Sequence, residues 1–263
     1  MSDGSVGDVS IRGRTIVVTG ASSGIGRATA ELLARSGAAV ALVGRNEERL
    51  KEAASTCTAS SDAPARWYSA DFAQLDQVEA LIPAVLRDFE RIDGIVNGAA
   101  VMGPPTSELL SLDAAAWDAV FAVNVRAPFI LSQHVARHII GHGGGGTIVT
   151  VTSSAAHRTA APVPYATSKA ALGGMTRTLA GALGQYGINV NAVAPGLTWT
   201  PSAKRNFPDE QALRRAVSEG PLANVFGRVS EPIDVAQVIV LLCSPATRQV
   251  TGQTIHVSGG NVV

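Results

Sequence analysis

Cysteine is scarce in this 263-residue chain, and neither sign of charge is in excess. Cys57 and Cys243 have no partner at the spacing of a metal site or redox motif, and two thiols make a poor disulfide framework, so a reducing cytoplasm is expected. Lysine plus arginine and aspartate plus glutamate both number 21, which leaves no net field to attract nucleic acid or an anionic membrane. The composition predicts action on a small molecule, with no nucleic-acid or membrane partner.

Long apolar segments are also lacking. No apolar run approaches the ~18 residues of a membrane helix, and MSDGSVGDVS at the start lacks the basic and apolar parts of a signal peptide. A hydrophobic content of 46% over 263 residues is enough for one α/β core. We therefore expect a polar tail over residues 1–12 and a single domain over residues 13–263.

Apolar runs of strand length alternate with stretches of helical periodicity. Strands are expected at 15–20, 38–44, 65–71, 94–100, 147–153, 188–195 and 254–258. Helices are expected after 24, from 46, and over 75–90, 117–139, 165–186 and 232–244. Because strands with two apolar faces alternate with helices, the pattern predicts a doubly wound α/β fold, in which helices cover both faces of one parallel sheet.

The segment from about 197 to 229 breaks this alternation. It combines Trp199 with three prolines and several charged residues, and it shows no strand pattern. A long insertion in a compact domain is usually a lid or a binding loop. We therefore expect residues 197–229, called the lid segment below, to cover a substrate site.

The stretch TGASSGIG, residues 19–26, lies between the first expected strand and the first expected helix. At this place in a doubly wound sheet, backbone N–H groups and the positive end of a helix dipole can hold the pyrophosphate of a dinucleotide. Gly20 would permit the tight turn, Gly24 the approach of the phosphates, and Gly26 the close packing of helix on sheet. The spacing differs from G-x-G-x-x-G, so the prediction depends on the position between strand and helix.

The end of the second strand indicates which dinucleotide binds. An acidic residue there would hydrogen-bond the adenosine ribose, whereas an arginine would pair with a 2′-phosphate. This chain has Gly44 in place of the acid, followed by Arg45, whose planar guanidinium suits a phosphate. The sequence favours NADP(H) as cofactor, with NAD(H) as the alternative.

The motif YATSK places Tyr165 and Lys169 on one face of an expected helix. An ammonium group beside a phenol favours the phenolate and lowers the pKa of the tyrosine, which could then exchange protons with an alcohol. The preceding strand ends in TVTSS and could bring a serine hydroxyl beside the phenol. The pattern predicts acid and base chemistry at a carbonyl or alcohol.

Taken together, these motifs resemble the short-chain dehydrogenase/reductase family from about residue 14 to residue 260, in the manner of the 3-oxoacyl-carrier-protein reductases. The resemblance is carried by TGASSGIG, SADF, NGAA, AVNVRAPF, TVTSS, YATSK, NAVAPGLTWTP and TGQTIHVSGG. It implies a Rossmann fold, hydride transfer between NADP(H) and a ketone or secondary alcohol, and a homotetramer or homodimer.

The resemblance also implies roles for individual residues. Tyr165 would exchange a proton with the substrate, Lys169 would hold the nicotinamide ribose and lower the tyrosine pKa, and Asn124 would anchor a relay water. The implied catalytic set is Asn124, Ser154, Tyr165 and Lys169. The implied cofactor-binding residues are Gly20, Ser22, Ser23, Gly24, Ile25, Gly26, Arg45, Asp71, Phe72, Asn97, Gly98, Ala99, Tyr165, Lys169, Pro195, Gly196, Thr198 and Thr200.

Counting back from Tyr165 does not identify the catalytic serine. The segment between the two serines and Tyr165 is about two residues shorter than is usual in the family. Position at the strand end favours Ser154 over Ser153. The family's Asn-Asn-Ala-Gly also differs here, since residues 97–100 read Asn-Gly-Ala-Ala. Details of the adenosine contact are therefore open.

A metal site and two other functions fit these residues less well. His134, His138 and His142 recur at helical spacing, but no second type of ligand joins them, so no metal site is expected. A non-catalytic nucleotide-binding scaffold would not need Tyr165 or Lys169, and a relative that catalyses elimination or dehalogenation would not need the glycine loop. Because all of these are present, an NADP(H)-dependent dehydrogenase/reductase is the leading hypothesis.

Overall fold

The core of the protein is one parallel sheet of seven strands in the order β3-β2-β1-β4-β5-β6-β7. A computed structural model describes residues 10–159, 161–205 and 207–262. The strands are β1 (Thr15–Thr19), β2 (Ala39–Gly44), β3 (Ala65–Ser69), β4 (Gly94–Asn97), β5 (Gly146–Val151), β6 (Ile188–Pro195) and β7 (Thr254–Val257). All seven expected strands are therefore confirmed, and the chain reverses its winding between β1 and β4.

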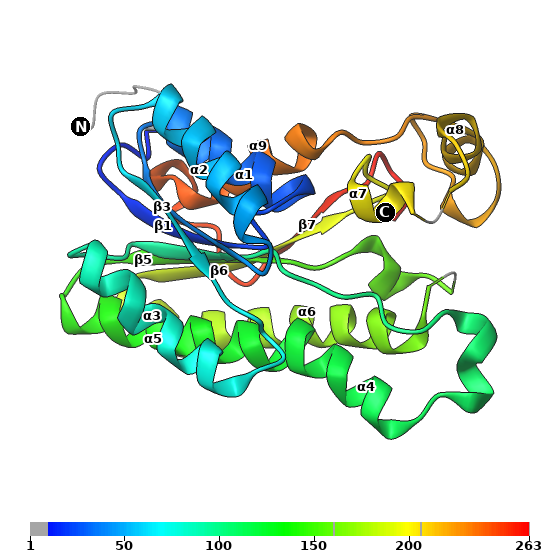
Figure 1. Ribbon diagram of the computed structural model, residues 1–263, viewed down its shortest axis with the longest axis horizontal. Helices are drawn as coiled ribbons and strands as arrows, with labels where there is room; N and C mark the ends of the chain where they lie inside the picture. The colour runs from blue at the N-terminus through cyan, green and yellow to red at the C-terminus, as the bar shows by residue number, and fades with distance from the viewer. Residues whose placement is uncertain (1–9, 160, 206, 263) are drawn as a thin grey trace.

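Helices cover both faces of the sheet, as the alternation of strands and helices predicted (Figure 1). On one face lie α1 (Gly24–Arg35), α2 (Glu47–Ser60) and α9 (Pro232–Cys243). On the other lie α3 (Leu75–Asp88), α4 (Ala114–Phe121), α5 (Ala127–Gly141) and α6 (Val163–Leu183). The central strands β1, β4 and β5 are buried along their whole length, whereas the edge strands β3 and β7 are partly exposed.

Two apolar cores follow from this arrangement, one on each side of the sheet. Ile16 and Val18 of β1 point into the core beneath α1, α2 and α9, together with Leu33 and Ile239. Val17, which alternates with them, points into the core beneath α3 and α5. Burial of these aliphatic side chains at about 1.5–3 kcal/mol each fixes the sheet, and with it the loops at the strand ends.

The helical run from 114 to 141 contains one turn of π-helix, η2 (Ala122–Arg126), between α4 and α5. It is the one segment in the described ranges with the length and apolar composition of a membrane span, although most of its side chains are not buried. In this fold α5 contacts α3 and strands β4 and β5. The π-turn matters because such bulges are often found at functional sites, and this one holds Asn124.

Both boundaries expected from the sequence are refined. Ile11 is fully buried in the core beneath α1, so the packed domain begins before residue 13, while residues 1–9 of the expected tail lie outside the described part. The lid segment is about half helical: it contains α7 (Pro201–Lys204), α8 (Glu210–Ser218) and the 3-10 helix η5 (Gly220–Leu222). Asp209 caps α8 by accepting the N–H of Ala212 at 2.7 Å. This cap explains why a helix forms in a segment that reads as a loop.

Candidate active site

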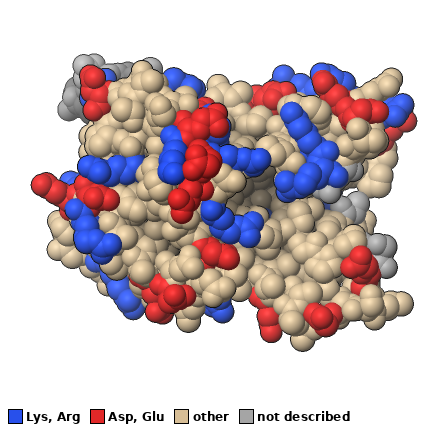
Figure 2. Space-filling model, in the orientation of Figure 1, with Lys and Arg blue, Asp and Glu red and all other residues tan. Residues whose placement is uncertain are grey.

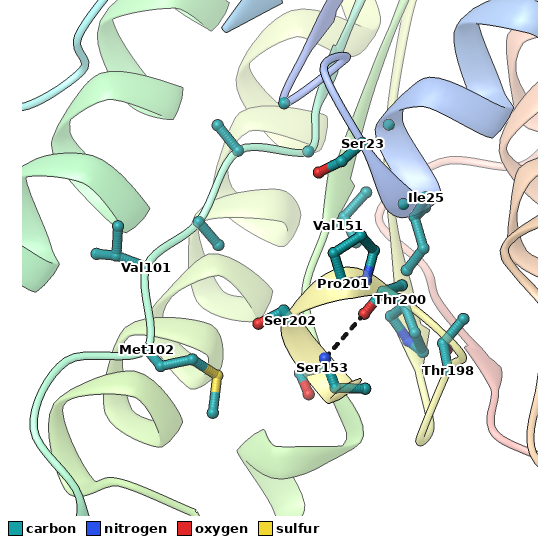
Figure 3. A pocket seen from close by; sticks show the side chains of 18 of the residues that line it. Ser23, Ile25, Val101, Met102, Val151, Ser153, Thr198, Thr200, Pro201 and Ser202 are labelled. Carbon is teal, nitrogen blue, oxygen red and sulfur yellow. Dashed lines mark hydrogen bonds between the residues drawn. The ribbon is translucent and has the colours of Figure 1, made fainter. Parts of the chain in front are cut away.

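A cleft of about 900 Å³ opens at the carboxyl ends of the strands, where the winding of the sheet reverses. Figure 2 shows a hollow on this face with lysine and arginine side chains around it. In Figure 3, Thr200, Pro201 and Ser202 lie between Ser23 and Ile25 on one side and Met102 on the other. The walls of the cleft are formed by the loop after β1, the ends of β2 and β3, the loop after β4, the end of β5, the start of α6 and the lid segment.

The glycine loop after β1 is shaped by contacts that side chains would prevent. Gly20 has φ +73°, and a Cβ there would lie 2.9 Å from the backbone of Gly98 and Ala99. A Cβ at Gly26 would overlap the carbonyl oxygen of Gly20. The turn therefore fits tightly against its neighbours without side chains, and the first turn of α1 faces the cleft.

The amino end of α1 has the properties of an anion site. Ser23 occupies the N-cap position in an extended conformation, but its side chain accepts no hydrogen bond from the helix, and no acidic residue lies in the first turn. The first N–H groups of α1 and the positive end of its dipole are thus directed at the cleft. Ser22, Ser23, Gly24, Ile25 and Gly26 all line the cleft, as expected for residues that would hold a pyrophosphate.

The end of β2 forms the adenosine side of the cleft. Gly44 is buried at the strand end, and the exposed Arg45 lines the cleft together with Arg49 of α2. Asp71 and Phe72, after β3, lie on the same side. Two arginines with no acid at position 44 fit a 2′-phosphate. Arg49 was not identified from the sequence, although its place one turn after Arg45 could have indicated it.

Tyr165 and Lys169 lie together near the base of the cleft, one turn apart on α6, as predicted. The Lys169 Nζ is 5.7 Å from the centre of the Tyr165 ring and donates a 2.7 Å hydrogen bond to the carbonyl oxygen of Val151. Lys169 is buried, and this burial lowers the pKa of its ammonium to about 8. The close approach of the two side chains agrees with the expected pairing.

The Tyr165 phenol differs from the sequence expectation. Burial raises its pKa, and the groups that act in the opposite direction are the hydroxyl of Ser153, by hydrogen bonding, and the positive charge of Arg158. Burial outweighs these two contributions, so the pKa of the phenol lies above its ordinary value, and the lowering expected from Lys169 stays a prediction. A phenol with a raised pKa is neutral near pH 7 and can act as a proton donor.

The serine beside Tyr165 is Ser153, not the expected Ser154. Ser153 lines the cleft and hydrogen-bonds the phenol, and its oxygen also accepts the N–H of Ala155 at 3.1 Å. Ser154 begins the 3-10 helix η3 (Ser154–His157) and is fully buried behind the cleft wall. The chain turns directly after β5, so the first serine, rather than the second, faces the cleft.

Asn124 supports the cleft from behind. Its side chain is fully buried in the π-turn η2, where Oδ1 accepts the N–H of Val101 and Nδ2 donates to the carbonyl of Val101, both at 2.9 Å. Nδ2 also donates to the hydroxyl of Ser168 on α6 at 3.0 Å. Asn124 thus joins the loop after β4 to the helix that carries Tyr165 and Lys169.

Comparison with known proteins agrees with this geometry. The family model described as enoyl-(acyl carrier protein) reductase matches residues 20–261. The short-chain reductase protein NovJ of Streptomyces niveus is 37% identical over 248 residues, which cover 93% of this chain and 92% of NovJ. The chain belongs to the short-chain dehydrogenase/reductase family. It is accordingly an enzyme, a dehydrogenase/reductase.

Two further relatives illustrate the range of the family. The 2,5-dichloro-2,5-cyclohexadiene-1,4-diol dehydrogenase of Sphingobium indicum is 37% identical over 254 residues, covering 95% of this chain and 97% of the relative. A crystal structure from Beutenbergia cavernae, described as an NAD(P)-dependent gluconate 5-dehydrogenase with bound NADP, superposes with a TM-score of 0.84 at 33% identity. The superposed region covers 96% of this chain and 98% of the Beutenbergia cavernae chain. The family binds NAD(P), and its members act on different small molecules.

The family motif after β4 has an unexpected orientation here. Gly98 and Ala99 line the cleft, but Asn97 does not: its side chain is buried and donates to Ser132 at 3.0 Å. Asn97 therefore does not occupy its expected place among the cofactor-binding residues, because alternation along β4 turns it away from the cleft. Thr19, which sequence reasoning missed, positions this loop, since its hydroxyl accepts the N–H groups of Gly98 and Ala99 at 3.0 and 3.2 Å.

The remaining expected cofactor residues lie along the cleft after β6. Pro195, Gly196, Thr198 and Thr200 all line it. Thr200 also caps α7 by accepting the N–H of Ala203 at 3.2 Å (Figure 3). Within the described residues, no group of three or more His, Cys, Asp or Glu side chains could hold a metal ion.

Proposed function

We propose that this enzyme transfers hydride between NADP(H) and a small ketone or secondary alcohol, with Tyr165 as the general acid and base. The observation that carries the proposal is the neutral phenol of Tyr165, hydrogen-bonded to Ser153 in a cleft whose far end offers the uncapped amino end of α1. The cofactor, when bound, supplies or accepts the hydride. The cytoplasm is the expected compartment, since both cysteines are free and buried.

Residues of this chain would bind the carbonyl oxygen of the substrate and supply its proton. The hydroxyls of Ser153 and Tyr165 would both donate to the carbonyl oxygen and hold it as negative charge develops. In reduction, the Tyr165 O–H bond breaks and its proton forms the new alcohol O–H. Lys169 lies beside the phenolate that is left and stabilises it by charge. Asn124, behind the cleft, would hold the loop after β4 against the helix that carries Tyr165 and Lys169. In oxidation each proton moves in the reverse direction.

The serine assignment gives a matched pair of variants. Ser153→Ala should lower kcat by about 10²- to 10³-fold, because one donor to the developing oxyanion is lost. Ser154→Ala should lower kcat much less, because its hydroxyl points away from the cleft and accepts from Arg158 instead. Steady-state oxidation of NADPH with one ketone substrate compares the two. A greater loss in Ser154→Ala would restore the original sequence prediction.

The preference for NADP(H) is proposed from Arg45 and Arg49, the two arginines beside Gly44. Arg45→Ala should weaken NADPH binding by roughly 10- to 100-fold, the effect of one hydrogen bond to a charged group, and should change NADH binding little. Titration of both cofactors, followed by tryptophan fluorescence, gives the dissociation constants. Tighter binding of NADH than of NADPH by the unaltered protein would refute the preference, and absence of binding of either would refute the proposed function.

We also propose that the enzyme assembles as a homotetramer or homodimer through the face formed by α4, α5 and α6. Phe129 and Ile140 of α5 are 42% and 37% exposed, and such an interface would cover them. Light scattering of the purified protein would test this, and a monomer mass at micromolar concentration would reject it.

A further inference from the structure

Arg158 is a charged residue in the substrate half of the cleft that the mechanism above does not use. It follows η3 directly and lines the cleft near Tyr165. One terminal nitrogen donates to the Ser154 hydroxyl at 2.9 Å, and the other donates to the carbonyl of Pro221 in the lid segment at 3.4 Å. The guanidinium thus bridges the end of the catalytic strand and the lid segment, and its plane is held from both sides.

The hydrogen bonding of this guanidinium is incomplete. Its Nε is buried and has no hydrogen-bond partner among the described residues, and no carboxylate of the described chain lies within 4.0 Å of it. Two of its five N–H groups are used by Ser154 and Pro221, so three remain. A partly buried cation without an anion is costly, and burial lowers the pKa of Arg158 accordingly. The site has the character of one half of an ion pair.

The other described residues around Arg158 supply no negative charge. Asp71 is the one acidic side chain on the described cleft wall, and it lies at the adenosine end. The substrate half has the apolar side chains of Met102, Phe207 and Leu222, with Arg205 of the lid segment as a second cation. A ligand that matches this surface has an apolar body and one anionic group.

We propose that Arg158 binds a carboxylate of the substrate, so that the enzyme acts on keto acids or hydroxy acids with an apolar body. This inference rests on the proposed function and specifies its substrate class. A planar carboxylate can accept two parallel N–H donors from a guanidinium, which fixes the orientation as well as the position of the substrate. Because Arg158 is bonded to Ser154, next to Ser153, and lines the same cleft as Tyr165, the carboxylate would lie near the reacting carbonyl.

A bound carboxylate would also affect the chemistry at Tyr165. The positive charge of Arg158 lowers the pKa of the phenol in the free enzyme. Pairing with the substrate carboxylate would reduce this contribution, and the phenol is already protonated near pH 7 because burial raises its pKa. Arg158 would thus select an anionic substrate, while Tyr165 supplies the proton for reduction of the carbonyl.

The test compares acids with their neutral esters. The probes are 2-oxo-4-phenylbutanoate and 4-oxo-4-phenylbutanoate, each with its ethyl ester, assayed with NADPH. The unaltered enzyme should show a higher kcat/KM for at least one acid than for its ester. Arg158→Gln should lower the acid-to-ester ratio of kcat/KM by roughly 10- to 100-fold, mainly through KM. Arg215→Gln, which removes an exposed charge of α8 outside the cleft, is the matched control and should leave the ratio unchanged.

A binding measurement separates this inference from the proposed function. Calorimetry with 3-phenylpropanoate and 3-phenylpropanamide, in the presence of NADP⁺, should show binding of the acid that is lost in Arg158→Gln. Such binding without turnover of any ketone would keep the carboxylate site and refute the proposed reaction. Turnover of esters at least as fast as of acids, or equal losses for both in Arg158→Gln, would keep the reaction and overturn the carboxylate site.

Discussion

Tyr165→Phe should lower kcat by about 10²- to 10⁴-fold, the usual contribution of a general acid or base, while NADPH still binds. The substitution removes only the phenolic oxygen and keeps the ring beside Lys169. In the unaltered enzyme, burial raises the pKa of this phenol, so the proton donor is present at neutral pH. Reduction should therefore proceed well near pH 7 and slow at high pH, whereas oxidation, which needs the phenolate, should accelerate as pH rises.

Stopped-flow and steady-state oxidation of NADPH measure the loss, and fluorescence titration measures cofactor binding. Tyr186→Phe is the matched control, because Tyr186 is 45% exposed and lies outside the cleft. It should retain the turnover of the unaltered enzyme. If Tyr165→Phe keeps more than about a tenth of kcat with cofactor binding intact, Tyr165 is not the general acid.

The parts of the site that depend on local sequence could be predicted. The periodicity of four residues between Tyr165 and Lys169 places them on one face of a helix wherever that helix packs. The glycine loop follows from the order of strand, turn and helix, and the buried strands follow from their continuous apolar runs. In each case the sequence pattern that indicates the element lies within a few residues of the motif.

The parts that depend on one residue of register could not be predicted. Ser153 and Ser154 are adjacent hydroxyls at a strand end, and which one faces the cleft depends on where β5 stops and η3 begins. The same applies to Asn97, whose alternation along β4 turns it towards Ser132. Element boundaries are the least reliable part of a sequence-based assignment, and at strand ends an error of one residue reverses the side chain.

The contribution of Arg158 depends on tertiary structure alone. Pro221, which accepts one of its hydrogen bonds, is 63 residues away in sequence and lies in a segment that reads as an irregular loop. The helical content of that segment could have been found, since Asp209 followed by Glu210 is a helix start. The orphaned Nε of Arg158 has no sequence signal, because burial is a property of the assembled cleft.

Lys169→Met should raise the stability of the cofactor-free protein at pH 7 by about 1–3 kcal/mol while it abolishes most activity. Burial lowers the pKa of Lys169 from an ordinary value of 10.5 to about 8. The unfolded chain therefore binds this proton up to a higher pH than the folded chain does. Between about pH 8 and pH 10.5, unfolding takes up a proton, so stability rises with pH; below pH 8 the full cost of burying the charge is present.

Methionine matches the length of lysine and carries no charge, so the variant should lose this dependence on pH. The free energy of unfolding of Lys169→Met should exceed that of the unaltered protein most near pH 7, and this difference should disappear near pH 10. Near pH 10 the substitution removes little buried charge, but it still removes the hydrogen bond from Lys169 to Val151. Urea denaturation at several pH values measures both curves. Lys51→Met is the control of opposite sign, because its exposed ammonium is paired with Glu48, which raises its pKa.

An equal pH slope in Lys169→Met and the unaltered protein would show that the ammonium is not destabilised by burial. The expected difference would mean that the folded chain retains an unfavourable buried cation beside Tyr165. Such a cost is explained if the charge is needed when the phenol loses its proton, since a positive group 5.7 Å from the ring then stabilises the phenolate. The lysine would thus reduce the stability of the resting enzyme and act favourably only during the reaction, as expected for a preorganised site.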